Sequence, residues 1–186
     1  MGKILVIGAG GQLGTELTKV LAEKYGNESI IATDFQENAR SKFVYCGFQT
    51  LNVLNKTELE NIVKKEGISQ IYHLAAILSA AGEKNPLQAW DLNMGGLLNV
   101  LEIARAYSIE KVFWPSSIAV FGPSSEKERT PQNAFKDPNT IYGISKLSGE
   151  HWCEYYFNKY GVDVRSVRYP GLIGYKSLPG GGTTDY

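Results

Sequence analysis

The sequence predicts an α/β fold in which a doubly wound parallel sheet forms one domain over residues 1–186. Strand-like apolar runs alternate with amphipathic helical stretches, and a glycine-rich turn joins the first strand to the first helix. No internal repeat or linker divides the chain, whose length suits one sizeable core. Polar and glycine residues follow the predicted strand ends, where ligands bind in open parallel sheets.

The glycine-rich turn follows the first predicted strand, residues 3–7, and a helix begins near Gln12. Its glycines fit the G-x-x-G-x-x-G form of a dinucleotide-binding turn. Gly8 allows the tight turn, Gly11 lets the backbone approach a pyrophosphate, and Gly14 lets helix and strand pack closely. The first N–H groups and the positive dipole end of the helix then face the phosphates. The sequence therefore predicts an NAD(P)-binding Rossmann fold.

The second predicted strand, residues 29–33, is followed by Asp34, which stands 20 residues beyond Gly14. A carboxylate at this place accepts hydrogen bonds from the adenosine ribose hydroxyls and repels a 2′-phosphate. Phe35 and Gln36 come next, so no arginine directly follows Asp34. We therefore predict NAD rather than NADP as the cofactor. A strand-end cap without a ligand is the alternative role for Asp34.

The remaining elements continue the alternation of strand and helix. We predict strands over residues 48–53, 68–74, 111–114 and 162–169, helices over residues 55–66, 86–107 and 142–160, and a surface loop over residues 122–140. Asn55 and Glu58 form a capping-box-like helix start, and Gly67 ends that helix. Pro86 suits the first turn of the next helix.

Tyr142 and Lys146 stand four residues apart in the last predicted helix and so share one of its faces. A nearby ammonium favours the phenolate, so the tyrosine could act as a base far below its reference pKa of about 10. A Y-x-x-x-K pattern alone recurs in many helices, where it means a surface lysine and a half-buried tyrosine. The glycine-rich turn at the other end of the chain favours the functional interpretation.

The charge balance and the cysteine count limit the partners and the location. Lys plus Arg and Asp plus Glu number 19 each, so we expect neither a nucleic acid nor a membrane as partner. No apolar run approaches the ~18 residues of a membrane span, and no signal-peptide core precedes the first strand. Cys46 and Cys153 are far apart, which predicts free thiols in the cytoplasm. With only His73 and His151 beside them, we expect no metal site.

Longer blocks of the sequence resemble the extended short-chain dehydrogenases/reductases. The glycine-rich turn, Ser117 and the Tyr142-x-x-x-Lys146 motif support this wider resemblance. Within that superfamily, residues 11–17, 73–80, 115–123, 168–173 and 179–186 resemble the short-chain L-threonine 3-dehydrogenases, and the last block is the most specific to them. The resemblance covers the whole chain.

The resemblance implies NAD-dependent oxidation of the 3-hydroxyl of L-threonine to 2-amino-3-oxobutyrate. By match to the family motif, Tyr142 would be the catalytic base, and Lys146 would bind the nicotinamide ribose and lower the pKa of Tyr142. Ser117 would hydrogen-bond the reacting oxygen, and Ser116 is the neighbour that could be confused with it. Hydride transfer needs such a set, namely a base, a donor that holds the oxygen and an oriented nicotinamide.

The resemblance also implies which residues bind the two small molecules. The expected cofactor-binding residues are Gly8, Gly11, Gln12, Leu13, Gly14, Asp34, Phe35, Asn52, Val53, Leu74, Ala75, Ala76, Asn93, Tyr142, Lys146, Tyr169 and Ile173, and the expected substrate-binding residues are Ser79, Ser117, Tyr142 and Thr184. Asn52 stands where relatives often have Asp, but its amide can still hydrogen-bond an adenine edge. Ser79 and Thr184 could equally satisfy loop backbone groups.

Two features concern what surrounds this domain. The family continues beyond the block at residues 179–186 into a smaller substrate-covering lobe, so we expect the sequence to be a C-terminally truncated fragment. The helix over residues 142–160 has aromatic residues around most of its circumference, and a helix with two apolar faces needs two partners. One partner is the sheet. The other is a second subunit, giving a homodimer through the helices near 86–107 and 142–160, or the C-terminal lobe.

Two other functions remain open at this point. A nucleotide-sugar epimerase or dehydratase of the same superfamily shares the glycine-rich turn and the Ser/Tyr/Lys set. The small-residue run at 180–184 suits a compact zwitterion better than a nucleotide diphosphate. A non-catalytic NAD-binding fragment is the second alternative.

Overall fold

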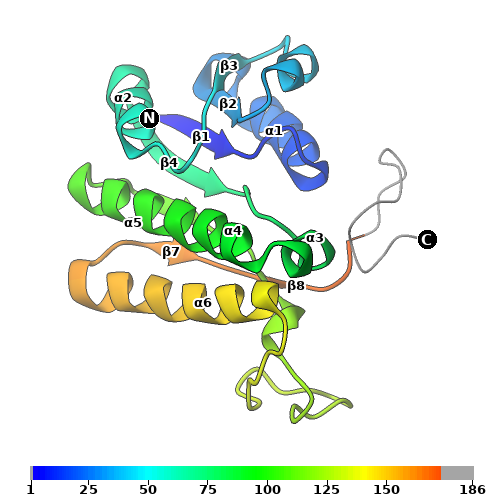
Figure 1. The fold of residues 1–186 in the computed structure, drawn as a ribbon. Coiled ribbons are helices and arrows are strands. Elements are labelled where there is room, and N and C mark those ends of the chain that lie inside the picture. Colours follow the sequence, from blue (N-terminus) through cyan, green and yellow to red (C-terminus); the bar gives the residue numbers. More distant parts are fainter. Residues whose placement is uncertain (1, 173–186) are drawn as a thin grey trace.

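The computed structural model describes residues 2–172 of the chain (Figure 1). Its strands are β1 (Lys3–Ile7), β2 (Ile30–Asp34), β3 (Gly47–Thr50), β4 (Ile68–His73), β5 (Lys111–Phe113), β6 (Ser116–Ser117), β7 (Val164–Arg165) and β8 (Arg168–Tyr169). Its α-helices are α1 (Gln12–Tyr25), α2 (Lys56–Glu66), α3 (Ser79–Lys84), α4 (Pro86–Trp90), α5 (Gly96–Ala106) and α6 (Ile141–Tyr160). Short 3₁₀ turns cover Asn27–Ser29, Glu37–Lys42 and Ile118–Val120.

Six parallel strands form the main sheet in the order β3-β2-β1-β4-β5-β7. The order reverses direction beside β1, which is the arrangement of a doubly wound dinucleotide-binding sheet. This confirms the predicted fold class. The reversal point lies between β1 and β4, so the ends of these two strands border the crevice in which such sheets bind ligands.

Alternate residues of the central strands supply two hydrophobic cores, one on each face of the sheet. Leu5 and Ile7 of β1 join a core with residues of α2, α5 and α6, and Figure 1 shows α5 and α6 side by side in front of the sheet. Ile4 and Val6 point to the other face and pack with α1. Because both faces of β1 are covered, its sequence is apolar at successive positions rather than alternating.

The helix predicted over residues 86–107 is interrupted. α4 passes into a π-helical turn at Asp91–Gly95 before α5 begins at Gly96. Such one-turn bulges change which side of a helix a residue faces and occur often at functional sites. Here the turn contains Asn93, whose side chain is 5% exposed. Periodicity alone did not indicate this interruption, because the apolar pattern continues through it.

The strand predicted over residues 162–169 is in fact two short strands. β7 pairs with β5 in the main sheet, whereas β8 pairs with β6 in a separate two-stranded ladder. The break lies opposite Pro115, which has no N–H to donate to a ladder. Beside it, the amide of Ser116 donates to Ser166 Oγ at 3.2 Å instead of to a strand carbonyl.

Three smaller differences separate prediction from structure. β3 ends at Thr50 rather than at residue 53, because a turn follows in which the amide of Asn55 donates to Asn52 O at 2.8 Å. Helix α3 and strand β6 were not predicted, because both are too short to show a period. The ends of α2 agree with prediction: Asn55 Oδ1 accepts from Glu58 N at 3.2 Å, and Gly67 is left-handed with φ 63°.

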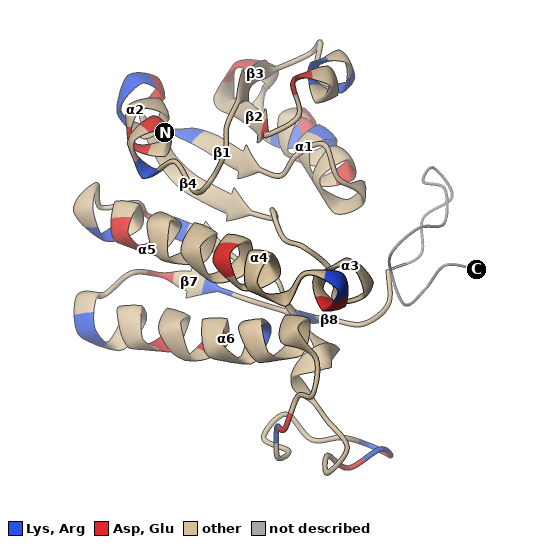
Figure 2. Cartoon of the chain, viewed as in Figure 1, with Lys and Arg blue, Asp and Glu red and all other residues tan. Residues whose placement is uncertain are grey.

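Residues of both charge signs are distributed over most of the helices and loops of the described chain (Figure 2). No helix in residues 2–172 is long and apolar enough to cross a membrane. The thiols of Cys46 and Cys153 are free, as predicted.

Candidate functional site

The glycine-rich turn has the geometry that its sequence predicts. Gly8 has φ +79°, and a Cβ there would lie 2.6 Å from the backbone nitrogen of Ala75. A Cβ on Gly14 would lie 2.4 Å from Gly8 O, so only glycine lets α1 approach β1 this closely. At Gly11 a Cβ would meet only Gly8 O, at 3.6 Å. Gly8 and Gly14 are therefore required by packing, whereas Gly11 faces open space at the start of α1.

A cleft of about 760 Å³ opens beside this turn, at the carboxyl ends of β1, β2 and β4. Of the expected cofactor-binding residues, Gly8, Gly11, Asp34, Phe35, Asn52, Val53, Leu74, Ala75 and Ala76 line it. Lys42, Gln88 and Asp91 also line it and were not predicted. Residues from five separate stretches thus meet at the edge of the sheet where ligands are expected.

Asp34 is held by two backbone amides at the end of β2. Its Oδ2 accepts from Gly10 N at 2.9 Å and its Oδ1 accepts from Gln36 N at 3.0 Å. The residue is 9% exposed and borders the cleft. An ionised carboxylate has about four acceptor sites, so Asp34 can also accept from ligand hydroxyls.

The wall of the cleft near Asn52 is braced from α5. The amide nitrogen of Asn99 donates to Val53 O at 2.9 Å, and Asn52 Oδ1 accepts from Leu54 N at 3.1 Å. Phe35 stands at the rim with 70% of its surface exposed. A planar base could lie between such a wall and such a ring.

Not all the expected site residues line the cleft. Gln12, Leu13 and Gly14 form the first turn of α1 beside it, and Ser79 begins α3. Ile173 and Thr184 lie outside the described residues. Asn93 is buried, where its Oδ1 accepts from Ile77 N at 2.8 Å and its Nδ2 donates to Ile77 O at 3.1 Å and Ser145 Oγ at 3.3 Å. Asn93 therefore holds the cleft-lining backbone of Ile77 against α6.

Ser117 and Tyr142, predicted from distant parts of the sequence, lie together: the Ser117 hydroxyl is near enough to the Tyr142 phenol to lower its pKa, while Ser117 Oγ accepts from Ala119 N at 3.1 Å. Tyr142 lies in the first turn of α6, where Thr140 Oγ1 caps the helix by accepting from Gly143 N at 3.0 Å. Ser117 ends β6, directly paired with Tyr169 of β8. The neighbouring Ser116 is 2% exposed and donates to Glu150 Oε1 at 2.7 Å. Of the two serines, Ser117 is the one at the tyrosine.

Lys146 lies one turn further along α6 and is 3% exposed. Its Nζ donates to Pro115 O at 2.6 Å and lies 4.4 Å from the centre of the Trp114 ring and 5.5 Å from that of Tyr142. Burial lowers the pKa of Lys146 to about 7. Trp114 was not predicted as part of the site, although an aromatic residue directly before Pro115 and the serines could have suggested it.

In this arrangement Lys146 does not lower the pKa of Tyr142, and the expected effect stays a prediction for the site with NAD bound. The pKa of Tyr142 is raised from its ordinary value because burial disfavours the phenolate, and the Ser117 hydroxyl opposes this only in part. The lysine donates its hydrogen bond to Pro115, away from the phenolic oxygen. The four-residue spacing placed both groups on one face but did not determine where the ammonium points.

A partly buried ion pair supports the strand that contains Ser117. Arg168 donates to both carboxylate oxygens of Glu150, with Nε–Oε1 2.7 Å and NH2–Oε2 2.8 Å, and its NH1 donates to Gln132 O at 2.8 Å. The Arg168 and Glu150 side chains are 16% and 19% exposed. Ser116 bonds the same carboxylate. One ion pair therefore joins α6, β6, β8 and the loop at residues 122–140.

His73 ends β4 and is 1% exposed. In the part of the chain that the structure describes, neither ring nitrogen has a hydrogen-bond partner. Burial, together with the charge of Lys146, lowers the pKa of His73 to about 3, so the ring is neutral at physiological pH.

The groups present fit a dinucleotide. The N-cap of α1 is Gly11, no side chain caps it, and its first turn contains no acid, so its N–H groups can meet a pyrophosphate. Asp34 borders the same cleft and can accept from ribose hydroxyls. Among the described residues, no group of three His, Cys, Asp or Glu side chains could hold a metal ion.

Comparison with known proteins gives one family model, described as the NAD dependent epimerase/dehydratase family, which matches residues 4–184. Among curated relatives, an uncharacterized epimerase/dehydratase of Staphylococcus haemolyticus is 51% identical over the whole of this chain. The chain spans 58% of the length of that relative.

Solved structures with a sequence identity above that of this curated relative include threonine dehydrogenases. A GalE-like L-threonine dehydrogenase from Cupriavidus necator, in its holo form, is 54% identical with a TM-score of 0.95, over 99% of this chain and 59% of that one. A monomeric L-threonine 3-dehydrogenase from a metagenome is 53% identical with a TM-score of 0.92, over 98% of this chain and 58% of that one.

Proposed function

The chain belongs to the NAD-dependent epimerase/dehydratase family, and we propose that it forms the NAD-binding part of an L-threonine 3-dehydrogenase. The observation that supports this best is the proximity of Ser117 to Tyr142, with Lys146 one helical turn away, at the end of a sheet whose cleft fits a dinucleotide. Solved threonine dehydrogenases with 53–54% identity favour this substrate.

NAD would supply the acceptor for a hydride from C3 of threonine. The glycine-rich turn and the start of α1 would hold its pyrophosphate, and Asp34 would accept from its adenosine ribose. Asn93 would act indirectly by holding Ile77 in the cleft wall.

Ser117 and Tyr142 would act on the hydroxyl of the substrate. The Ser117 hydroxyl can donate a hydrogen bond to the reacting oxygen of the substrate. Tyr142 lies beside Ser117 and, as a phenolate, can accept the proton of the substrate hydroxyl. Tyr142 has a raised pKa here, so a phenolate needs a positive charge brought nearer than Lys146 Nζ now lies. Turning that ammonium from Pro115 O towards the phenol and a ribose hydroxyl would supply it.

An epimerase or dehydratase acting on a nucleotide sugar is the second candidate, favoured by the description of the curated relatives. It would use the same Ser117, Tyr142 and Lys146. The substrates differ in their ionic character: threonine is a small zwitterion, whereas a nucleotide sugar carries a diphosphate.

Two measurements test the proposal, on a full-length protein that contains this chain, because the chain alone is expected to bind NAD but to oxidise little or no threonine. Calorimetry should give NAD binding, and NADH formation should depend on L-threonine and not on UDP-sugars, with Tyr142→Phe as the inactive control. Conversion of a UDP-sugar without net NADH formation would favour the epimerase. NAD binding with neither reaction would leave a non-catalytic NAD-binding module as the function.

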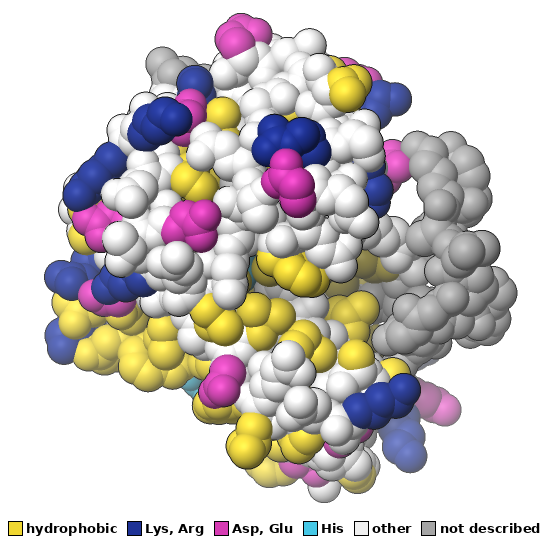
Figure 3. Space-filling model, turned by 45° about the horizontal axis from the view of Figure 1, so that its top comes forward, with side chains coloured by type: hydrophobic (Ala, Val, Ile, Leu, Met, Phe, Trp, Pro, Cys, Tyr) yellow, Lys and Arg dark blue, Asp and Glu magenta, His cyan; other side chains and the backbone are white. Residues whose placement is uncertain are grey.

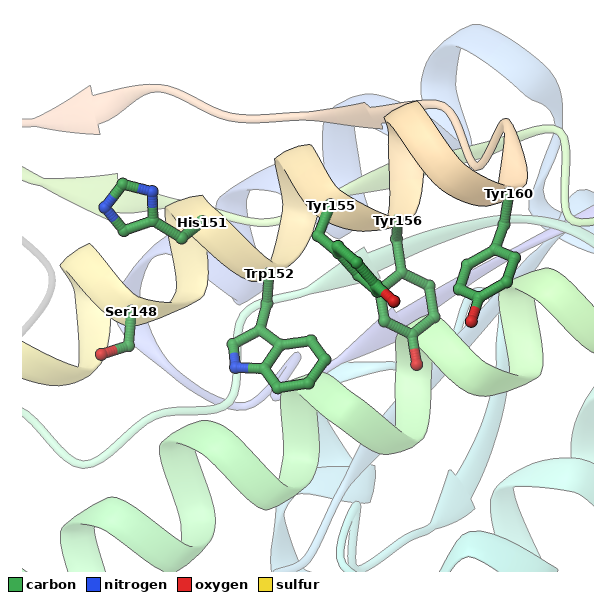
Figure 4. A pocket seen from close by; sticks show the side chains of 6 residues that line it. All are labelled: Ser148, His151, Trp152, Tyr155, Tyr156 and Tyr160. Atoms are coloured by element: carbon green, nitrogen blue, oxygen red, sulfur yellow. The ribbon is translucent and has the colours of Figure 1, made fainter.

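We also propose that the outer face of α5 and α6 binds a second copy of the chain. Trp152, Tyr155, Phe157 and Tyr160 are each 40–56% exposed on α6. Hydrophobic side chains gather at this edge of the molecule, at the lower left of Figure 3. Figure 4 shows the rings of Trp152, Tyr155, Tyr156 and Tyr160 extending from α6 towards α5 around a hollow of about 720 Å³.

This face has the features of an interface between copies. It is rich in exposed tyrosine and tryptophan, which are enriched at protein interfaces, and a two-helix surface can pack against its own copy about a twofold axis. Exposed apolar patches of this kind on a soluble domain mark interaction sites. Because one solved relative is described as monomeric, the oligomeric state must be measured for this chain.

A further inference from the structure

Lys42 reaches from the end of its 3₁₀ turn to the glycine-rich turn. Its Nζ donates to Gly10 O at 2.7 Å, although the two residues are 32 positions apart. Lys42 lines the dinucleotide cleft. Among the described residues that line this cleft it is the only lysine or arginine. A cation is therefore present at the cleft, although none directly follows Asp34 in the sequence.

Gly10 lies between Lys42 and Asp34. Its N–H donates to Asp34 Oδ2 at 2.9 Å, while its carbonyl accepts from Lys42. A Cβ on Gly10 would lie 2.8 Å from Asp34 Oδ2 and 3.0 Å from Ala39 Cβ, so a larger residue would push these groups apart. The carboxylate and the ammonium thus border the adenosine end of the cleft on the two sides of one glycine.

The neighbouring cation of the same turn is engaged elsewhere. Arg40 Nε donates to Glu37 Oε1 at 2.6 Å, and its guanidinium lies 5.0 Å from the centre of the Phe48 ring. Arg40 does not line the cleft. Lys42, by contrast, bonds a neutral carbonyl, which a phosphate could replace with a stronger, charge-assisted hydrogen bond.

We propose that Lys42 is a second specificity-determining residue of the cofactor site, an anchor for a 2′-phosphate whose effect is masked by Asp34. This inference rests on the proposed dinucleotide site. Asp34 repels a 2′-phosphate from a nearly buried position, whereas Lys42 is exposed and its attraction is screened by solvent. The site therefore binds NAD more tightly than NADP, and the ratio of the two affinities is smaller than it would be without Lys42.

The sharpest test measures NAD and NADP binding by calorimetry in an Asp34→Asn background, with and without Lys42→Met. In that background Lys42→Met should weaken NADP binding about fivefold and change NAD binding less than twofold, because only NADP has the extra phosphate. Lys42→Arg should retain most of the NADP affinity. Lys19→Met on α1, 62% exposed and away from the cleft, is the control for a general loss of positive charge.

Two results would overturn the assignment. An equal weakening of NAD and NADP would mean that Lys42 only braces the glycine-rich turn, and a NADP affinity unchanged within twofold would mean that it contacts no phosphate. If Asp34→Asn does not fold, the same comparison in the Asp34 background, at high NADP concentration, gives the same test. If the protein binds NAD and Lys42→Met gives either of these two results, only the role of Lys42 is refuted. If the protein binds neither NAD nor NADP, the dinucleotide site itself is refuted.

Discussion

The side-chain nitrogen of Lys146 lies 2.6 Å from the carbonyl oxygen of Pro115 and donates a hydrogen bond to it. Pro115 stands at the break between β5 and β6, so its carbonyl is not part of a strand ladder and is available to the lysine. Trp114 adds a ring 4.4 Å away. A buried ammonium is expensive, and a hydrogen bond and a π-face offset that cost only in part.

Lys146→Met should therefore stabilise the protein at neutral pH, by on the order of 1–3 kcal/mol in the free energy of unfolding. The pKa of Lys146 is about 7 in the folded chain, against about 10.4 when unfolded. Between these values the unfolded state binds more protons, so the stability of the wild type should rise with pH across this window. Denaturant titrations at several pH values measure both effects, and the rise should be absent in Lys146→Met.

The same Lys146→Met change should weaken NAD binding and slow the reaction, because the lysine is proposed to hold the nicotinamide ribose. Removing a buried charge that takes part in binding or catalysis is expected to increase the free energy of unfolding and to reduce function. A variant that loses stability would show instead that the Pro115 hydrogen bond outweighs the burial of the charge.

In the full-length protein, Tyr142→Phe should leave NAD affinity nearly unchanged and lower threonine-dependent NADH formation by about 10² or more, as loss of a general base does. Tyr25→Phe is the matched control, because it removes the same hydroxyl from a tyrosine of α1 that does not line the cleft. Single-turnover kinetics of both variants measures the chemical step. Retention of most activity by the phenylalanine variant would mean that another group takes the proton.

NAD should bind at least tenfold more tightly than NADP, since placing a 2′-phosphate beside the Asp34 carboxylate costs at least ~1.4 kcal/mol. Asp34→Asn should narrow this gap while keeping an acceptor for one of the two backbone amides that Asp34 now binds. Dissociation constants from calorimetry give the ratio directly. Equal constants in the wild type would contradict the role assigned to Asp34.

Glu150→Ala should destabilise the protein by about 1–3 kcal/mol, because it leaves the partly buried Arg168 without its carboxylate partner. It should also reduce turnover more than NAD affinity, since the ion pair supports β6 and β8 around Ser117. Glu154→Ala, an exposed site on the same helix, is the control. If the two variants had equal stability in denaturant, the ion pair would have no supporting role.

Trp152→Arg should convert a dimer into a monomer, because it places a charge in the aromatic face of α6 that we propose is covered by a second copy. Sedimentation of both proteins at micromolar concentration measures the change. Phe135→Arg, which alters a 69% exposed aromatic residue in the loop, should leave the dimer intact. A wild type that sediments as a monomer would exclude this interface.

The sequence by itself determined the alternation of the main strands and helices, the glycine-rich turn and the ligand-binding edge of the sheet, but not α3, β6, the π-helical turn or the division of the last strand. The features that it determined depend on local chemistry: apolar runs that must be buried on both faces, and glycines at positions where a Cβ would collide, as at Gly8 and Gly14. The same local spacing placed Tyr142 and Lys146 on one helical face. The choice of Ser117 over Ser116 came from the family resemblance, and Ser117 is the serine whose hydroxyl lowers the pKa of Tyr142.

Only the tertiary structure decided where charged groups point and what they meet. Lys42 reaches the cleft across 32 residues, and Arg168 joins a helix 18 residues away, contacts that no periodicity predicts. The break at Pro115 directs a carbonyl to Lys146, and burial then lowers the pKa of that lysine and raises that of Tyr142. Desolvation depends on every atom packed around a group, so it becomes defined only when distant segments have come together.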